Sequence, residues 1–506
     1  MQLIVIGAGF GGLAAAIRLR AQGHDVTLVE KRDKPGGRAY VFEQDGFTFD
    51  AGPTIITAPW LIDDLFAAAG RRAADYVTLV SIDPYYNVRF GDGSVFRYNG
   101  DQEDVVRQVR DFNPADVDGY LRFSRSTEKI FDKGFALIDK PFTRLVDMLK
   151  VVPDLITLQS HKSVAAYVNQ FISDERLRQV FSFHPLLVGG NPFQSTSIYA
   201  LIHHLEKKWG VWFAMGGTGA LVAALARLFT DIGGILRLES EVEEIVVNDQ
   251  TRRATGVRLR GGELLPADAV VSNGDVAFTY MKLVAPRHRP RNTDARMKRR
   301  KYSMSLFVSY FGTDRKYDDM AHHEIIMGPR YEGLLREIFH TGTLAKDFSL
   351  YLHRPSATDP SLAPAGCDCW YVLSPVPHLG GATDWSVAAQ PYRDSIMKYL
   401  EERYMPGLTK HIVTERVIDP RYFRDDLSSY LGSAFAVQPT LMQSAWMRPH
   451  NVSEDIANLY FAGAGTHPGA GLPGVISSGK IVADMIGRAD AKVPATRPGT
   501  AARAAR

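Results

Sequence analysis

The sequence is poor in the features that mark several large classes of protein. It has only two cysteines among 506 residues, Cys367 and Cys369, and a spacing of one intervening residue is poorly suited to a disulfide. No third cysteine offers a metal ligand beside them. The sequence therefore contains neither a disulfide framework nor a cysteine-based metal set, and it favours a reducing, cytoplasmic setting.

Long apolar runs are also missing. No stretch reaches the roughly 18 to 20 uninterrupted apolar residues that a membrane-spanning helix needs. The N-terminus, MQLIVIGAGF, lacks a basic leader segment, and Gly7 and Gly9 interrupt its apolar run. We therefore expect neither a signal peptide nor a spanning helix, so any contact with a membrane must be peripheral.

The charge balance and the motif content exclude further classes. A formal net charge of +3 over the whole chain does not favour a nucleic-acid partner. No HExxH motif, zinc-binding set or convincing Ser/His/Asp arrangement occurs, so we expect no metal and no hydrolytic chemistry. The hydrophobic share of 45% and the length of 506 residues predict a chain that folds into two or three domains.

Glycine is abundant at two places, and the first is the N-terminus. Gln2 to Ile6 is typical of a buried strand, and Leu13 to Gln22 of a helix, with Gly7, Gly9 and Gly12 between them in the spacing G-x-G-x-x-G. These glycines permit a tight turn, close approach to a pyrophosphate and close helix–strand packing. Glu30 ends the next strand and would accept hydrogen bonds from a ribose, so the segment predicts a dinucleotide site, NAD or FAD.

The second glycine cluster, GAGTHPGAGLPGV, runs from Gly463 to Val475. A strand pattern precedes it at Asn458 to Ala462, and a helix pattern follows over Val475 to Met485. Its glycines permit close approach to a planar ligand, and the helix that opens near Pro473 and Gly474 directs its positive end toward negative charge. We therefore expect both glycine clusters to hold one ligand.

The choice between NAD and FAD depends on further segments, which resemble those of a known family. KPGGR follows the acidic strand, then FTFDAGPT, and together with NLYFAGAGTHPGAGL these segments resemble the amine oxidase and phytoene desaturase superfamily of flavoproteins. FSFHPLLVGGNPF and KKWGVWFAMGGTGALV are similar to its bacterial-type, lycopene-forming phytoene desaturases, and the likeness covers about residues 2–486. With the glycine turns, the resemblance implies FAD and these cofactor-binding residues: Gly7, Gly9, Gly12, Glu30, Lys31, Gly37, Arg38, Gly52, Pro53, Thr54, Val242, Gly463, Gly465, Thr466, Gly474 and Val475.

The expected fold class is α/β. It combines a Rossmann-type FAD-binding domain, discontinuous in sequence, with an inserted mixed α+β substrate domain and a helical membrane-facing part. The expected division is as follows: FAD-binding domain, residues 1–95, 211–275 and 421–488; helical substrate and membrane-facing region, 96–210; substrate-binding domain, 276–420; disordered tail, 489–506.

Two segments suggest contact with a membrane. Phe142 to Leu158 is unusually apolar for a segment that also carries charges, and it could lie in a bilayer surface. A basic cluster suits anionic headgroups and comprises Arg287, Arg289, Arg291, Arg296, Lys298, Arg299, Arg300 and Lys301. A packed amphipathic helix and a solvated charged face are the alternatives.

The implied activity is stepwise desaturation of phytoene to lycopene. FAD accepts a hydride, and a base could take the proton; Asp147, among aliphatic neighbours, is one candidate, with a solvated helical position as the alternative. No second dinucleotide unit is found for a nicotinamide, which favours oxygen or a quinone as the electron acceptor. The rival functions are a flavin amine or porphyrinogen oxidase and a non-catalytic isoprenoid-lipid carrier of the GDP-dissociation-inhibitor type.

Overall fold

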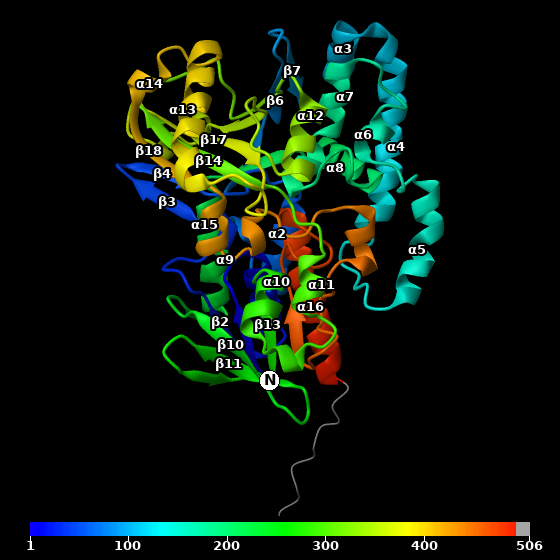
Figure 1. Ribbon diagram of the computed structural model, residues 1–506, viewed down its shortest axis with the longest axis vertical. Coiled ribbons are helices and arrows are strands. Elements are labelled where there is room, and N and C mark those ends of the chain that lie inside the picture. Colours follow the sequence, from blue (N-terminus) through cyan, green and yellow to red (C-terminus); the bar gives the residue numbers. More distant parts are fainter. Residues whose placement is uncertain (492–506) are drawn as a thin grey trace, which may run out of the picture.

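The computed structural model describes residues 1–491, with side chains through residue 487. In Figure 1 a sheet with its helices fills the lower half, a second sheet lies at the upper left, and a group of helices lies at the upper right. Residues 489–491 form the end of helix α16 (Leu472–Ala491), which corrects the expected start of the tail. The rest of that tail lies outside the described residues.

The first sheet has five parallel strands in the order β19–β13–β1–β2–β9. Their bounds are Leu459–Phe461 (β19), Ala269–Ser272 (β13), Gln2–Ile6 (β1), Asp25–Val29 (β2) and Ile235–Arg237 (β9). Parallel neighbours need long crossover connections, and here the strands come from widely separated segments. This is the discontinuous Rossmann-type arrangement that the sequence predicts, and the α/β fold class is confirmed.

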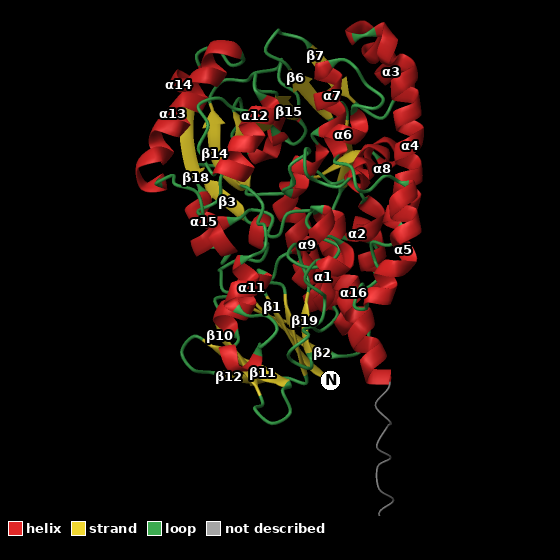
Figure 2. Cartoon of the chain, turned by 45° about the vertical axis from the view of Figure 1, so that its right-hand side comes forward, coloured by secondary structure: helices red, strands yellow, loops and turns green. Residues whose placement is uncertain are grey.

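Helices cover one face of this sheet and further strands the other (Figure 2), and each face has its own apolar core. Helices α1 (Phe10–Ala21), α9 (Gly217–Asp231) and α16 pack on one face. Antiparallel strands cover the other: β10 (Val242–Val247), β11 (Ala254–Leu259) and β12 (Leu264–Pro266). Strand β1 shows the cause, because Leu3 and Val5 join the helix-side core whereas Ile4 and Ile6 join the opposite one, as the two-residue period of a strand requires.

The second sheet has seven strands in the order β18–β14–β17–β16–β15–β6–β7. Their bounds are Ile412–Ile418 (β18), Ser305–Thr313 (β14), Asp368–Val376 (β17), Leu350–His353 (β16), His323–Ile326 (β15), Tyr86–Arg89 (β6) and Val95–Tyr98 (β7). Helices α13 (Trp385–Arg403) and α14 (Leu408–His411) cover one face. Because β6 and β7 belong to this sheet, the domain boundary expected at residue 95 falls inside it.

The helical region follows β7 in the chain. After α8 the chain returns through β8 to α9, which packs on the five-stranded sheet. Its helices are α3 (Gln102–Phe112), α4 (Val117–Phe135), α5 (Leu145–Thr157), α6 (Val164–Val168), α7 (Glu175–Ser182) and α8 (Leu201–Trp209). The remaining elements are β3 (Val41–Gln44), β4 (Phe47–Asp50), α2 (Pro59–Ala68), β5 (Leu79–Ile82), β8 (Val211–Ala214), α10 (Val276–Phe278), α11 (Asp294–Lys298), α12 (Tyr331–Arg336) and α15 (Pro420–Asp425).

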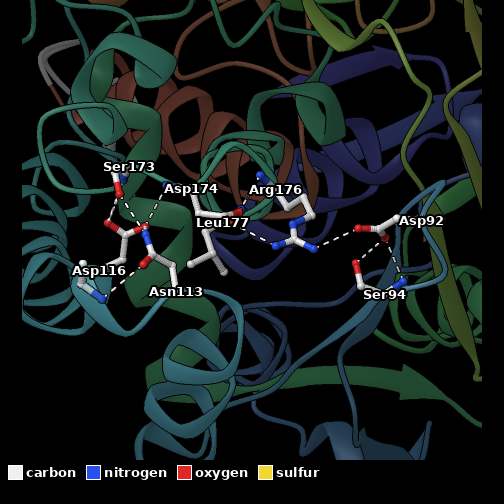
Figure 3. Close-up of polar contacts among 9 residues, drawn as sticks. Asp92, Ser94, Asn113, Asp116, Ser173, Asp174, Arg176 and Leu177 are labelled. Atoms are coloured by element: carbon white, nitrogen blue, oxygen red, sulfur yellow. Dashed lines mark hydrogen bonds and ion pairs between the residues drawn. The ribbon is translucent and has the colours of Figure 1, made fainter.

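Polar contacts hold the helical region together and connect it to the edge of the second sheet (Figure 3). Asp116, just before α4, accepts hydrogen bonds from the backbone N–H groups of Ser173 and Asp174 at 2.8 Å each. Arg176 in α7 donates to Asp92, in the turn between β6 and β7, at 2.9 Å.

Among residues 1–491, no helix combines the length and the apolarity needed to cross a bilayer.

Candidate functional site

One cavity of about 600 Å³ is shared by all three parts of the molecule. Both glycine clusters, the inner face of the second sheet, and helices α5 and α8 contribute to its walls. One end is therefore backbone-rich and polar, and the remainder is lined mainly by aliphatic side chains.

The N-terminal glycines form the turn that the spacing predicts. Gly7 and Gly9 line the cavity, and Gly7 has φ +91°, a conformation that favours glycine. Gly12 does not line it, since a Cβ there would lie 2.0 Å from the carbonyl oxygen of Gly7. Gly7 and Gly9 are thus placed for contact with a ligand, whereas Gly12 allows α1 to pack against β1.

Glu30 and Lys31 line the cavity where β2 ends. The Glu30 carboxylate is buried and accepts hydrogen bonds from the backbone N–H of Ala8 at 2.8 Å and of Arg32 at 3.1 Å. Lys31 Nζ donates to Ser428 Oγ at 2.9 Å, and burial lowers the pKa of its ammonium group. The carboxylate is therefore held against the glycine turn, in the position from which it would accept ribose hydroxyl hydrogens.

The C-terminal glycine loop meets the N-terminal turn directly. Gly463, Gly474 and Val475 line the cavity, and the backbone N–H of Gly463 donates to Ser478 Oγ at 2.7 Å. Gly465 and Thr466 do not line it. A Cβ on Gly465 would lie 3.0 Å from Val276, and Thr466 Oγ1 donates to the Pro449 carbonyl at 2.7 Å. These two residues were expected to contact the cofactor, but they support the loop from behind.

The GGR turn and the D-x-G-P-T segment lie backbone to backbone, and Gly37, Arg38, Gly52, Pro53 and Thr54 all line the cavity. A Cβ on Gly52 would lie 1.9 Å from the Arg38 carbonyl oxygen. Arg38 Nη2 donates to Ser429 Oγ at 2.9 Å; burial lowers the pKa of this guanidinium, and the nearby Asp275 carboxylate opposes that shift. The cavity therefore has a buried cationic fork beside a side-chain-free turn.

Asp50 connects the D-x-G-P-T segment to helix α9. Asp50 accepts hydrogen bonds from the backbone N–H of Thr218 at 2.8 Å and of Gly219 at 3.0 Å, at the start of α9. Burial raises the pKa of the Asp50 carboxyl to about 6, and these bonds oppose the rise. Val242 lines the cavity from the start of β10, where the resemblance places a contact with adenine.

The apolar part of the cavity runs between α5 and the second sheet. Its aliphatic lining includes Met148, Val151, Leu155, Leu306, Val308, Ile325, Met327 and Leu373. Both faces of the second sheet are apolar. Successive residues of β14 show this, because Val308 faces the cavity while Phe307 belongs to the core under α13. This part suits a long hydrocarbon better than a polar substrate.

Asp147 is not part of this wall. It occupies the first turn of α5, where its carboxylate accepts a hydrogen bond from the backbone N–H of Arg144 at 3.2 Å. In that position the carboxylate caps the start of the helix. A role for Asp147 as a base stays a prediction, and this position does not support it, because the side chain caps the helix and does not line the cavity.

Sequence reasoning missed polar groups in the wall. Thr54 Oγ1 lies 3.0 Å from Tyr351 Oη and 2.9 Å from Tyr371 Oη, so strands β16 and β17 hold the D-x-G-P-T segment. Glu206 in α8 is fully buried and lines the cavity, and Tyr86 donates to its carboxylate at 2.7 Å. Next to Lys207 and Lys208 it is typical of a solvated helix face, so no local signal could have found it.

The comparisons with known proteins identify the family. The family described as flavin containing amine oxidoreductase matches residues 10–487. The chain belongs to this family. A phytoene desaturase (lycopene-forming) of Pseudescherichia vulneris is 53% identical over 96% of this chain and 98% of its own length. The enzyme of the same name from Pantoea ananas is 51% identical over 95% and 98%.

Solved structures agree on the fold of this flavoprotein family. Cyclohexylamine oxidase from Brevibacterium oxydans matches with a TM-score of 0.60 at 16% identity, covering 97% of this chain and 99% of that one. An oxidoreductase from Methanosarcina mazei matches with a TM-score of 0.62 at 16% identity, covering 96% and 100%. The family match over residues 10–487 confirms the expected family and its flavin cofactor, whereas the individual cofactor contacts stay predictions.

The described residues fit FAD. Gly12 and Gly52 leave no room for a Cβ, so the backbone turns form a cradle that only glycine permits. A buried carboxylate at Glu30, the start of helix α1 and the Arg38 fork all border the same cavity. These are the groups that a ribose, a pyrophosphate and a flavin ring require.

Proposed function

We propose that this protein is an FAD-dependent phytoene desaturase that converts phytoene to lycopene by successive desaturations in carotenoid biosynthesis. The observation that carries the proposal is one cavity that joins the glycine cradle to a long aliphatic wall. The names of the relatives that are 53% and 51% identical support the same activity. An amine substrate would need polar or charged partners, for which the aliphatic wall has few groups.

Bound FAD supplies the oxidation, since flavins accept hydride from carbon. The chain contributes shape and electrostatics. The aliphatic walls exclude water and align a hydrocarbon along the cavity, and its affinity comes from buried area at roughly 25 cal/mol per Å² before ordering costs. Arg38 and the start of α16 place positive potential beside the cradle, where it favours the reduced, more negative cofactor.

Helix α5 supports delivery of phytoene from a membrane. Leu145, Val146, Leu149 and Ile156 expose their side chains, the last to 67%, while Met148, Val151 and Leu155 on the same helix line the cavity. One apolar helix thus borders both solvent and the substrate cavity. We propose that its outer face lies in the bilayer surface, which would make the protein a cytoplasmic, peripheral membrane enzyme.

One member of the basic cluster, Arg300, is linked to this helix through a short turn. Arg300 donates to the carbonyl of Met447 at 3.4 Å, and the short turn Ala445–Met447 packs against α5. Most side chains of the cluster are exposed, but Arg289 is buried and paired with Asp294 at 2.6 Å, so it is not available to headgroups. We propose that the exposed members of the cluster bind anionic lipids.

We also propose that oxygen or a membrane quinone reoxidises the flavin.

The test is turnover in liposomes. Purified protein with FAD is incubated with phytoene in vesicles, with and without a quinone, and the products are separated by chromatography. We expect coloured products up to lycopene. Unchanged phytoene together with flavin reduction by amines would favour an amine oxidase, and a colourless protein without flavin would favour the lipid carrier.

A further inference from the structure

Arg448 is a buried arginine that has no carboxylate partner among the described residues. Four arginines of residues 1–487 have at most 9% of their surface exposed: Arg18, Arg289, Arg354 and Arg448. The first three each pair with a carboxylate, at 2.5–3.0 Å. Arg448 is 2% exposed and has no such pair within the described range. A buried charge without a counter-charge is costly, so Arg448 calls for an anion that the protein alone does not supply.

The guanidinium of Arg448 is bonded to four backbone carbonyl groups. Its Nε donates to Thr466 at 3.0 Å and its Nη2 to Ala464 at 2.7 Å, so two of the bonds reach the C-terminal glycine loop. The other two run to Gln443, at 3.4 Å, and to Val437, at 3.1 Å. Carbonyl dipoles satisfy the N–H donors, but they carry no net charge. The side chain therefore holds the loop and still leaves a positive charge uncompensated.

This charge lies directly behind the wall of the cavity. Ala464, whose carbonyl accepts from Arg448, lines the cavity, and so do His467 and Pro468 on the same loop. A Cβ on Gly469 would lie 3.4 Å from Arg448 Cζ, so the loop passes closely over the guanidinium. One layer of backbone thus separates a buried cation from the cavity that fits the flavin.

The other cations beside the cradle have carboxylates near them. The charge of Arg38 interacts with the carboxylate of Asp275, and that of Lys31 with the carboxylate of Glu241. No carboxylate lies comparably near Arg448 among the described residues. Burial lowers the pKa of its guanidinium, but arginine stays protonated in proteins, so the charge is permanent. The uncompensated positive potential behind the loop therefore comes from Arg448.

We propose that Arg448 stabilises the anionic, reduced state of the bound flavin and thereby raises its reduction potential. Uptake of two electrons and one proton gives the flavin one additional negative charge, and a fixed cation in a dry site stabilises that charge more than the oxidised form. Arg448 acts through the loop and does not line the cavity, so it is a positioning residue. The inference concerns the cofactor alone and is independent of which substrate the enzyme oxidises.

The test is the reduction potential of the flavin in the full, FAD-loaded chain, measured by anaerobic titration against a reference dye. Arg448→Met keeps an unbranched side chain and removes the charge. We expect this variant to bind reduced FAD about ten-fold more weakly, relative to oxidised FAD, than the wild type does, a fall of about 30 mV in the two-electron potential. Arg289→Met is the matched control, because Arg289 is similarly buried and bonded to carbonyls but pairs with Asp294. The control should keep the wild-type potential.

The potential separates this role from a purely structural one. An arginine that only held the loop would change flavin content or melting temperature, and one that paired with the pyrophosphate would weaken both redox states equally. An unchanged potential in Arg448→Met would therefore overturn the proposal. An equal fall in Arg289→Met would overturn it as well, because it would show a general effect of lost packing.

The wild type provides a test that does not depend on the folding of a variant. When the protein is fully reduced in slightly acidic buffer, we expect the absorption spectrum of the anionic flavin, because a nearby cation opposes uptake of a further proton. The spectrum of the neutral reduced flavin would contradict the proposal. If Arg448→Met does not fold, Arg448→Gln, which keeps hydrogen-bond donors for the loop carbonyls, replaces it in the measurement of the potential.

Discussion

A Cβ atom on Gly11 would lie 2.9 Å from the Cα atom of Gly463, so the two glycine clusters from opposite ends of the sequence are in backbone contact. Both residues line the cavity. The cradle therefore exists only when the first and the last parts of the chain have folded together, which couples binding of the flavin to closure of the whole domain.

The first prediction concerns this contact. Gly11→Ala should lower the flavin content of the purified protein at least roughly ten-fold, equivalent to about 1.4 kcal/mol, because the methyl group separates the two turns. The measurement is the ratio of flavin to protein absorbance. Gly91→Ala is the matched control, since a Cβ there meets nothing within 4 Å. Full flavin content in Gly11→Ala would show that the turns do not grip a common ligand.

The second prediction concerns the carboxylate at the end of β2. Glu30→Ala should weaken FAD binding about 10- to 100-fold, because a hydrogen bond to a charged group contributes about 1.5–3 kcal/mol. Titration of the apoprotein with FAD, followed by flavin fluorescence, measures the change. Glu43→Ala is the control, because Glu43 is exposed and pairs only with Lys34. Equal affinities in the two variants would remove Glu30 from the site.

The third prediction concerns α5. Leu149 and Ile156 are 59% and 67% exposed, and changing both to Ser should reduce binding to liposomes about ten-fold through loss of apolar contact. Cosedimentation with vesicles measures this. The double change of Val387 and Val413 to Ser is the control, at exposed apolar sites of 71% and 52% on other elements. An equal loss in both would mean that no single face meets the membrane.

The fourth prediction concerns Asp147. Since its carboxylate caps α5, Asp147→Asn should keep turnover within about two-fold and lower stability by about 0.5–1 kcal/mol. Phytoene turnover and chemical unfolding measure the two effects. A folded, flavin-loaded variant that no longer oxidises phytoene would restore Asp147 as a candidate base.

The fifth prediction concerns pH. Burial by itself would raise the pKa of Glu454, but hydrogen bonds from His450 and Asn292 outweigh it and lower this pKa from 4.5 to about 2. A carboxyl with a depressed pKa stabilises the fold above its unfolded value, and the contribution is lost as pH falls from 4.5 toward 2. Glu454→Gln should therefore be less stable by about 2 kcal/mol near neutral pH, with a difference that shrinks in acid.

Unfolding curves at several pH values test this pH dependence. Glu402→Gln is the control, because Glu402 is exposed and pairs, among the described residues, only with Lys398, at 3.8 Å. A stability difference between Glu454→Gln and wild type that stays constant with pH would exclude the proposed linkage.

Local features of the sequence predicted the cradle well. The turn at Gly7, the GGR turn at Arg38 and the loop at Gly463 all line the cavity as expected. Neighbouring residues are enough to set the backbone conformation of such glycine turns, so a local pattern can predict them. Gly465 and Thr466, which were also expected to contact the cofactor, do not line the cavity. Within one loop, which residues face the ligand and which face the core depends on what packs behind them.

By itself the sequence determined the paired glycine turns and the apolar character of the substrate region, which follow from spacing and composition. Its motifs indicated the flavoprotein class by their resemblance to a known family. Only the tertiary structure decided that β6 joins the second sheet, that Asp147 caps a helix, and that Thr54 meets Tyr351. The physical reason is that strand pairing and side-chain direction are set by contacts between residues far apart in the chain, which no local pattern encodes.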